Sequence, residues 1–478
     1  MASFDGCLQF AVQHCPILYE KSFKLKEKQL QTLKALYERN DCISVLPTGY
    51  GKSVIFHMLP WFAQHLHNKD KPMIVIVVCP LNSIMQDQVL SLRKAGINAC
   101  TISITGTHGI AFDETNADEE NFEDDSSQPC TIESDVPFEK LQKGEFNLIY
   151  SHPEALMKTR FAKLLRSKLY QDTVCAVVID EVHMISECTD ISFTGPLSFL
   201  YSFLCRGEEF RPAFMKLGDV VCVFEKALHL LLTATATPKS VLTLTKQINL
   251  KNPVVITENV DRPNIFLETR TRLPNIKKFE KYDDLIEPVI SELREKRHSF
   301  PVTIMYVDNL EALGYFFQYA AYNLQDLGYE GEKIPQNRLF AQYHKDYPES
   351  MKKIILQELT SLDPKLRLVF ATVALGMGVN SPSVVRIIHS RPPTTLEKYL
   401  QEIGRAGRLG QEATAIMYFN QSDIAKNRKG ITDEMRKYCT HRGCLRLMLV
   451  NYFGFDSPVH SGEKISCCSN CKTLAQQI

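Results

Sequence analysis

A glycine-rich segment near the N-terminus has the residues needed to bind a phosphate chain. It reads LPTGYGKS over residues 46–53, between an apolar β-branched run and a helical pattern. Two glycines permit a tight path along which backbone N–H groups point at a phosphate, and the following helix N-terminus adds positive potential. Lys52 would place its charge on the β- and γ-phosphates, and Ser53 would bind Mg²⁺. The expected nucleotide-binding residues of this loop are Thr48, Gly49, Gly51, Lys52 and Ser53.

A pair of carboxylates lies about 130 residues further along the chain. Asp180 and Glu181 directly follow the apolar run VVI of residues 177–179. Ligands of α/β sheets bind at the carboxyl ends of the strands. Asp180 would hold Mg²⁺, partly through water, and Glu181 would orient or deprotonate an attacking water. A solvated acidic pair is the alternative, but the upstream phosphate loop favours hydrolysis of ATP.

Short β-branched runs alternate with helical patterns and must position these groups. Strands are expected at 42–46, 73–79, 147–150, 174–179 and 228–232, and in a second series at 302–306, 338–341, 367–370, 385–388 and 413–418. Such alternation favours parallel sheets covered on both faces. Because DRPN at 261–264 lies between the two series, we expect domains at 1–260 and 261–420, followed by a Cys-rich segment at 421–478.

Length and composition set further bounds. A chain of 478 residues with 44% hydrophobic and 23% charged residues is too long for one core, and its zero net charge does not indicate a partner. Its longest apolar run, Met73–Leu81, is shorter than the roughly 20 residues that span a bilayer. We therefore expect no membrane partner and no signal peptide. The acidic stretch 113–135 is expected to be a solvated or disordered insertion, and the ten scattered cysteines suit a reducing compartment.

The sequence QEIGRAGR at 401–408 resembles motif VI of superfamily 2 helicases, and in detail that of the RecQ family. The resemblance implies two tandem RecA-like domains. It also implies that Arg405 and Arg408 are arginine fingers that contact the γ-phosphate. Such a finger can be worth about 10³–10⁵ in rate.

Other segments follow in the order of the family's motifs. LKEKQ at 25–29 is similar to motif 0, which implies that Gln29 contacts adenine, and TATAT at 233–237 is similar to motif III. CPLNSIMQDQ at 79–88, SHPE at 151–154 and the segment at 367–380 are similar to motifs Ia, Ib and V. The resemblance implies DNA-backbone contacts, which hold phosphates without reading bases, from Ser83, Gln86, Pro153 and Thr372.

The family's aromatic loop, which senses single-stranded DNA, is only partly matched. EEFRPAF at 208–214 is similar to its end and implies DNA contacts by Phe210 and Arg211. The preceding part is replaced, and residues 184–209 contain no Trp. Other aromatic side chains there could rebuild a stacking platform, or the altered segment could weaken the coupling of DNA binding to hydrolysis. The candidate stacking residues are Phe193, Phe199, Tyr201 and Phe203.

The Cys-rich segment resembles the RecQ zinc subdomain. CLRLMLVNYFG at 444–454 is similar to its start, and CSNC at 468–471 has the C-x-x-C spacing that offers two thiolates to one tetrahedral ion. The implied Zn²⁺ ligands are Cys444, His460, Cys468 and Cys471. Cys467 could replace Cys468, while Cys439 and His441 are rivals to His460. Free reduced thiols are the alternative to a metal site.

Together these features predict an α/β protein of two RecA-like domains with a small helical zinc-binding subdomain. The expected function is that of a RecQ-type, ATP-dependent DNA helicase that moves 3′–5′ on single-stranded DNA and unwinds duplexes or junctions in DNA repair, recombination or replication. ATP, Mg²⁺ and Zn²⁺ are the expected cofactors, and a DNA substrate implies the nucleus. Only seven residues follow Cys471, so we expect no winged-helix domain. A DNA-binding ATPase regulator with impaired unwinding and an RNA-directed DExH ATPase are the alternatives.

Overall fold

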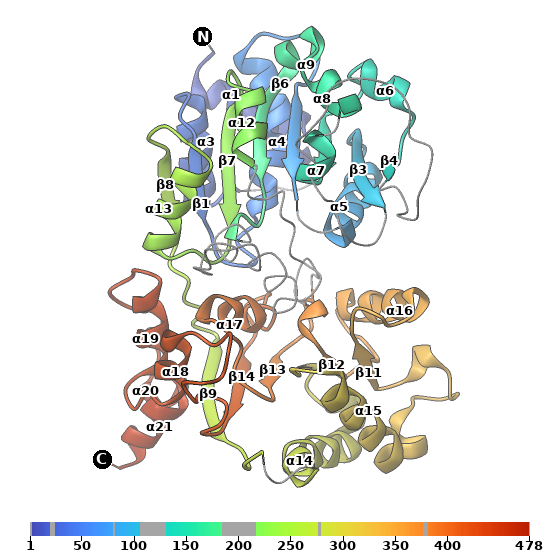
Figure 1. Cartoon of the computed structure of the whole chain (residues 1–478), viewed down its shortest axis with the longest axis vertical. Coiled ribbons are helices and arrows are strands. Elements are labelled where there is room, and N and C mark those ends of the chain that lie inside the picture. The colour runs from blue at the N-terminus through green and yellow to red at the C-terminus, as the bar shows by residue number, and fades with distance from the viewer. Residues whose placement is uncertain are drawn as a thin grey trace. The chain divides into compact units, whose positions relative to one another are not determined.

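The computed structural model describes residues 2–19, 24–79, 82–105, 131–157, 159–183, 217–275, 279–375 and 381–477. Most of the predicted acidic insertion, 113–135, lies outside these residues. The chain forms two compact units (Figure 1). The first contains Met1–Ser44, Gly51–Thr233 and Ser240–Ile256, and the second contains Val45–Tyr50, Ala234–Lys239 and Thr257–Ile478.

The first unit is built on a sheet whose described strands run in the order β4-β3-β5-β2-β6-β7-β1-β8. The strands are β1 (Cys42–Val45), β2 (Ile74–Val78), β3 (Ala99–Thr105), β4 (Thr131–Ser134), β5 (Leu148–Ser151), β6 (Val174–Ile179), β7 (Leu228–Thr233) and β8 (Val254–Thr257). β3, β5, β2, β6 and β7 pair in parallel, whereas β4 is antiparallel to β3. Every residue of β2 and β6 is buried, as expected for strands covered on both faces.

Helices cover this sheet, and four of them carry residues predicted to bind ligands. α4 packs against β2 and β6, and α5 packs against β3 and β5 (Figure 1). The helices are α1 (Phe4–His14), α2 (Pro16–Tyr19), α3 (Glu27–Tyr37), α4 (Lys52–Leu66), α5 (Asn82–Lys94), α6 (Phe138–Gln142), α7 (Pro153–Met157), α8 (Thr159–Leu165), α9 (Lys168–Thr173), α12 (Leu217–Val223) and α13 (Pro238–Gln247).

The second unit has a sheet whose described strands run in the order β11-β12-β10-β13-β14-β9, with all neighbouring pairs parallel. The strands are β9 (Ile265–Thr271), β10 (Thr303–Tyr306), β11 (Phe340–Tyr343), β12 (Leu368–Ala371), β13 (Arg386–His389) and β14 (Ala413–Phe419). The α-helices are α14 (Glu280–Lys296), α15 (Leu310–Leu324), α16 (Glu349–Thr360), α17 (Leu396–Ile403), α18 (Asp433–Cys439), α19 (Leu445–Tyr452), α20 (Lys464–Cys467) and α21 (Ser469–Gln476). Short 3₁₀ turns are η3 (Arg297–Ser299), η4 (Gln325–Gly328), η5 (Pro335–Asn337) and η6 (Val373–Leu375).

Alternate residues of this second sheet enter two different cores. Ile304 and Tyr306 join a core with α17 and α19, whereas Met305 joins a core with α14 and α15. Successive side chains of a strand point to opposite faces, so the sheet is covered on both sides. The two tandem parallel-sheet domains predicted from the sequence are confirmed.

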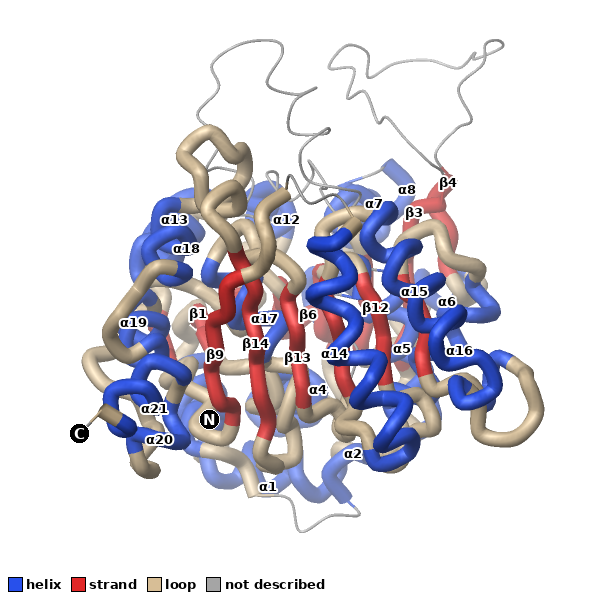
Figure 2. Tube along the Cα trace, turned by 90° about the horizontal axis from the view of Figure 1, so that it is seen from below, coloured by secondary structure: helices blue, strands red, loops and turns tan. Residues whose placement is uncertain are grey.

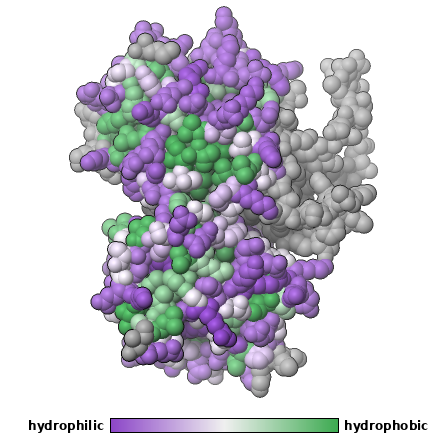
Figure 3. All heavy atoms as spheres, turned by 90° about the vertical axis from the view of Figure 1, so that its left-hand side faces the viewer, coloured by the Kyte–Doolittle hydropathy of each residue, from purple (hydrophilic) through white to green (hydrophobic). Residues whose placement is uncertain are grey.

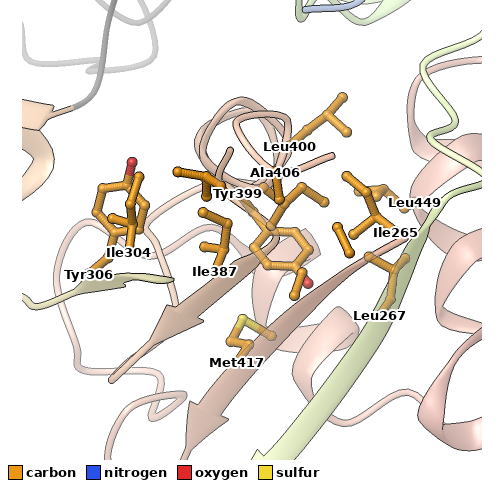
Figure 4. Packing of buried hydrophobic residues seen from close by; sticks show 14 of the residues in the cluster. Ile265, Leu267, Ile304, Tyr306, Ile387, Tyr399, Leu400, Ala406, Met417 and Leu449 are labelled. Carbon is orange, nitrogen blue, oxygen red and sulfur yellow. The ribbon is translucent and has the colours of Figure 1, made fainter. Parts of the chain in front are cut away.

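The Cys-rich segment shares its core with the second sheet rather than forming one of its own. Tyr438, Leu449 and Cys468 belong to the same buried cluster as β9 and α17. Helices α19, α20 and α21 lie beside β9 in both views (Figures 1 and 2), and Leu267 of β9 forms a parallel bridge with Cys468. In the close view, Leu449 lies next to Ile265 and Leu267 (Figure 4). The segment predicted as a subdomain, 421–478, therefore packs as an extension of the second unit.

Hydrophobic patches lie between hydrophilic side chains on the face of both units shown in Figure 3. Large apolar side chains that remain exposed include Leu242 and Leu474. Single exposed apolar residues are normal on folded proteins and do not mark a site by themselves. Among the helices of the described ranges, none is both long and apolar enough to cross a bilayer.

Candidate nucleotide site and cysteine cluster

The glycine-rich loop connects β1 to α4 and contains two residues that must be glycine. Gly49 and Gly51 have φ values of 81° and 90°, in the left-handed region that other residues rarely adopt. A Cβ atom on Gly51 would also lie 2.8 Å from the side-chain nitrogen of Gln29. Lys52 and Ser53 then form the first turn of α4, and the positive end of the helix dipole favours an anion there. The loop thus has the backbone expected of a phosphate site.

Gln29 holds this loop in place. Its side chain is 1% exposed, its Nε2 donates to the Gly51 carbonyl at 2.9 Å, and its Oε1 accepts from the Lys26 amide at 2.8 Å. These bonds fix the start of α3 (Glu27–Tyr37) against the turn that precedes Lys52. The sequence suggested a contact with adenine for Gln29. That contact stays a prediction, while a structural role in the loop is visible.

Asp180 and Glu181 lie directly after β6, at the carboxyl edge of the sheet. The Asp180 carboxylate accepts a hydrogen bond from the Glu181 amide at 3.0 Å. Glu181 has a φ of 52°, a left-handed conformation that is strained for a non-glycine residue. Its carboxylate lies 3.3 Å from Nδ1 of the buried His183, which in turn lies 3.2 Å from the Thr233 hydroxyl at the end of β7. The turn is therefore tied to the following strand.

The electrostatics of this turn suit a cation. Burial raises the pKa of Asp180 to about 7, and the negative charge of Glu181 adds to the rise, whereas Lys52 and His183 oppose it. Lys52 opposes the rise because its positive charge favours the ionised carboxylate. A divalent ion would favour ionised Asp180 and remove the repulsion from Glu181. Ser53 and Asp180, the residues predicted to hold Mg²⁺, fit that role chemically.

Arg405 and Arg408 lie in the second unit, in the loop that follows α17. The Arg405 side chain is buried, and within the described part of the chain neither its Nε nor its Nη1 has a hydrogen-bond partner. Buried donors without partners are costly, so a charged group with open donors indicates a missing anion. Arg408 is only partly buried. The helix before the loop is fixed by a hydrogen bond of 2.8 Å between Nε2 of the buried His389 and the Glu402 carboxylate.

Four cysteines of the second unit converge at one point. The Sγ atoms of Cys444, Cys467, Cys468 and Cys471 all lie within 4.8 Å of one another. A tetrahedral zinc site with Zn–S bonds of about 2.3 Å requires sulfur atoms about 3.8 Å apart. Cys444 and Cys467 are 3.6 Å apart, and a hydrogen bond from Cys444 lowers the pKa of Cys468 to about 4. The donor set therefore fits a zinc ion, which would cross-link α19, α20 and α21.

The fourth member of this group differs from the prediction. Cys467 belongs to the group, and His460 does not. The His460 amide donates to Asp261 at 2.8 Å, and its Nδ1 lies 3.2 Å from the Pro263 carbonyl. The rival candidates Cys439 and His441 are also outside the group. Cys467 ends α20 whereas Cys468 is extended, with φ −160° and ψ 167°, so the two adjacent thiols reach the same point from different backbone directions.

Comparisons with known proteins agree with this architecture. The family model described as DEAD/DEAH box helicase matches residues 26–244, and the model described as helicase conserved C-terminal domain matches residues 277–410. The ATP-dependent DNA helicase RecQ of Bacillus subtilis is 24% identical over 95% of the chain, and the ATP-dependent DNA helicase Q1 of Rattus norvegicus is 26% identical over 94%. The bifunctional 3′-5′ exonuclease/ATP-dependent helicase WRN of Mus musculus is 26% identical over 91%. The chain is thus similar to RecQ-type helicases of superfamily 2 along most of its length.

This RecQ-like chain spans 65%, 62% and 27% of the lengths of those three relatives. Solved structures show the same fold at low identity. The helicase MrfA bound to DNA and AMPPNP matches 98% of the chain and 59% of its own length, with a TM-score of 0.60 and 13% identity. The DEAD-box helicase Mss116 bound to ssRNA and UDP-BeF matches 97% and 82%, with a TM-score of 0.60 and 14% identity. At these identities the likeness concerns the fold alone.

The residues of the RecQ-like chain predicted to contact DNA lie on several elements. Ser83 and Gln86 belong to α5, where the Gln86 side chain is exposed. Thr372 follows β12, and its hydroxyl accepts from the Ala374 amide at 3.4 Å. Pro153 begins α7 and is buried, so its ring is not available at the surface. Phe210, Arg211 and the altered aromatic segment 184–209 lie outside the described residues.

Proposed function

We propose that this RecQ-like protein is an ATP-dependent DNA helicase that moves 3′–5′ along single-stranded DNA and unwinds duplexes. The observation that supports it best is the chemistry gathered in the first unit. Lys52 begins α4, and the buried Asp180 next to Glu181 responds to the Lys52 charge. These are the groups needed to bind the phosphates of ATP, hold Mg²⁺ and activate water.

Each residue has a defined task in the proposed reaction. The Lys52 ammonium neutralises the β- and γ-phosphates, and Glu181 orients the attacking water. Mg²⁺, held by Ser53 and Asp180, would offset negative charge on the phosphates when bound. Arg405 would stabilise the charge that develops on the transferred phosphoryl group, and its unpartnered buried donors support that role. Backbone contacts from α5 and from Thr372 would hold DNA without reading its sequence.

The decisive assay compares ATP hydrolysis with and without single-stranded DNA. We expect stimulation by DNA in the wild type and its loss in Lys52→Ala. Lys69→Ala is the matched control, because Lys69 is an exposed lysine of the same unit. Strand displacement on duplexes with 3′ or 5′ tails then tests direction, and only 3′-tailed duplexes should be unwound. Turnover that is equal in the wild type and Lys52→Ala would contradict the proposal.

A DNA-binding ATPase regulator with impaired unwinding is the second candidate. It is favoured by the absence of Trp from residues 184–209, where the family carries its DNA-sensing loop. In the same assays such a protein would bind DNA without stimulated turnover or strand displacement. A mimivirus relative is named as an ATP-dependent RNA helicase and is 25% identical over 93% of the chain. For this reason the ATPase assay should also be carried out with RNA in place of DNA. Stronger stimulation by RNA than by DNA would favour an RNA-directed ATPase.

A role in DNA repair, recombination or replication, and residence in the nucleus, belong to the same proposal. Both follow from a DNA substrate. Imaging of the tagged full chain before and after DNA damage tests them together. Exclusion of the wild-type protein from nuclei under both conditions would contradict this part of the proposal.

A further inference from the structure

The arginine-bearing loop of the second unit is held by an arginine that sequence patterns did not single out. Arg262 directs its guanidinium at three main-chain carbonyls of this loop. It donates to Gly404 at 3.2 Å, to Ala406 at 3.1 Å and to Gly407 at 2.8 Å. These carbonyls flank Arg405 on both sides. The direction of the Arg405 side chain therefore depends on the Arg262 contacts.

Asn264 closes the other side of the same loop. Its Nδ2 donates to the carbonyls of Gly407 at 2.9 Å and of Gln411 at 2.8 Å. Gly407 has a φ of 61°, and a Cβ atom there would lie 2.3 Å from Asn264 Nδ2. Only glycine allows so close an approach. The loop is thus fastened through its backbone and not through the Arg405 side chain.

Arg262 is itself fixed from the Cys-rich segment. Arg446 of α19 is 1% exposed, and its Nη1 donates to Asp261 Oδ1 at 2.6 Å and to the Arg262 carbonyl at 2.9 Å. Its Nη2 donates to the Cys467 carbonyl at 3.1 Å. Burial alone would lower the pKa of Arg446, but Asp261 and Cys467 together outweigh burial and raise the pKa. A continuous path of bonds runs from the cysteine cluster to the loop.

The packing follows the same path. Leu449 of α19 and Ala406 of the loop belong to one buried cluster with Ile265 and Leu400 (Figure 4). A planar guanidinium can serve several fixed acceptors at once, whereas an ammonium is a compact point charge. The geometry therefore requires Arg rather than Lys at position 262.

We propose that Arg262 and Arg446 are positioning residues, through which the Cys-rich segment sets the arginine-finger loop for hydrolysis of ATP. The role of the loop in hydrolysis rests on the proposed function. Hydrogen bonds connect Cys467 to Arg446, Arg446 to Arg262, and Arg262 to the loop. Through them, the activity of the first 420 residues depends on the packing of the last 58. Loss of either arginine leaves nucleotide binding intact and lowers the rate of the chemical step.

The chain contains a matched control for a buried Arg–Asp pair. Arg272 and Asp423 lie in the same unit, with a distance of 2.7 Å and side-chain exposures of 2% and 0%. The bonds of Arg272 go to Asp423 and Asn275, with none to residues 404–411 among the described contacts. Arg272→Gln thus reports the general cost of breaking a buried ion pair in this unit.

The test measures hydrogen–deuterium exchange of the 404–411 peptide in the full-length protein, without nucleotide. Arg262→Gln and Arg446→Gln should speed exchange in this peptide about tenfold, and Arg272→Gln should leave it unchanged. Asp261→Asn provides a milder break of the same path if Arg446→Gln does not fold. Equal exchange of the 404–411 peptide in Arg262→Gln and Arg272→Gln would overturn the inference, whatever the outcome of the ATPase assays.

Turnover provides the second arm. Arg262→Gln should lower kcat for ATP about tenfold or more with KM little changed. Because Arg262 acts through Arg405, the double variant Arg262→Gln/Arg405→Ala should be no slower than Arg405→Ala alone. If the decreases in kcat of the two single variants multiplied in the double variant, this mechanism would be overturned. If Lys52→Ala kept the turnover of the wild type while hydrogen–deuterium exchange followed the expected pattern, the proposed function would be overturned. The positioning of the loop by Arg262 would still stand.

Discussion

The Tyr150 hydroxyl lies 2.7 Å from Gln88 Oε1 and 3.0 Å from His57 Nε2. Because the hydroxyl donates its proton to Gln88, it accepts one from His57, whose Nε2 must carry a proton. His57 belongs to α4, the helix that begins with Lys52, and Gln88 belongs to α5, the helix that carries Gln86. The buried Tyr150 and two partly buried side chains thus connect the phosphate-loop helix to the helix predicted to contact DNA.

The partly buried His57 makes the stability of the protein depend on pH. Burial lowers its pKa from 6.5 to about 4. Above pH 6.5 His57 is neutral in both the folded and the unfolded state, so its full contribution to stability is present. Between pH 6.5 and pH 4 the unfolded chain takes up a proton that the folded state does not. The free energy of unfolding therefore decreases as the pH is lowered, by up to about 3 kcal/mol.

We expect His57→Gln to reduce this loss, because glutamine does not titrate. Urea unfolding of the wild type and variant at pH 7.5 and pH 5 measures the difference. His65→Gln is the control, since His65 lies on the same helix and its replacement leaves His57 in place. The same pH-dependent loss of stability in His57→Gln and the wild type would show that His57 is not the responsible group.

Asp180 gives a second pH dependence, in the binding of Mg²⁺. Burial and the charge of Glu181 raise the pKa of Asp180 to about 7, and Mg²⁺ binds the ionised carboxylate. Affinity for Mg²⁺ with ADP should therefore fall as pH drops below 7, by about tenfold per pH unit well below the pKa. For folding of the metal-free chain, the raised pKa means that stability from this group decreases as pH rises from 3.8 to 7.

Fluorescent ADP titrated with Mg²⁺ at pH 6, 7 and 8 tests the Asp180 prediction. In Asp180→Asn, binding should be weak at every pH and lack this dependence. Titration without Mg²⁺ is the control for changes in the nucleotide itself. An Mg²⁺ affinity in the wild type that is equal at pH 6 and pH 8 would rule out a carboxylate titrating near 7 at this site.

Sequence patterns could locate the groups that lie on one short segment. Lys52 is fixed by a local strand–loop–helix pattern, and Asp180 by the end of an apolar strand, so neither requires knowledge of distant contacts. The strands β3 and β9 were missed because ACTISIT and IFLETRT mix polar and apolar residues and do not form continuous apolar runs. Propensity is weak evidence for such half-polar strands.

Contacts between distant segments could not be predicted in this way. Arg446 meets the Arg262 carbonyl across 184 residues of sequence. Cys467 enters the cysteine group because Cys468 bridges to Leu267 of β9, which orients the two adjacent thiols. Spacing alone favoured His460, since a pattern of ligand intervals contains no information about that bridge.

The cysteine cluster predicts one zinc ion per chain, bound through Cys467 rather than His460. Cys467→Ser should lose the metal, and His460→Ala should keep it, because the four sulfur atoms already lie within 4.8 Å of one another. Elemental analysis of purified protein measures this directly. Cys439→Ser is the control, as Cys439 is a buried cysteine of the same unit outside the group. Metal retained in Cys467→Ser but lost in His460→Ala would restore the ligand set expected from the sequence.

Arg405 predicts an unusual separation of activity from stability. Its Nε and Nη1 are buried without partners within the described residues, so these two donors contribute little to folding and are costly without an anion. Arg405→Ala should therefore leave the urea midpoint unchanged or slightly raised. The same change should lower kcat for ATP by about 10³-fold, because it removes a charge that acts in the transition state. Arg405→Lys should recover only part of the rate, since lysine cannot reproduce the guanidinium's fork of donors.

Measurements of urea unfolding and DNA-stimulated turnover on the same preparations give both quantities. The comparison with Arg272→Gln is the most informative one, because Arg272 is equally buried but paired with Asp423. That variant should lose stability, because it removes two hydrogen bonds to the fully buried Asp423, although Asp423 keeps Arg391 Nε as a partner at 2.7 Å. It should keep kcat wherever it remains folded. If Arg405→Ala instead lost stability as Arg272→Gln does and kept its turnover, Arg405 would be a structural residue of the second unit and not an arginine finger.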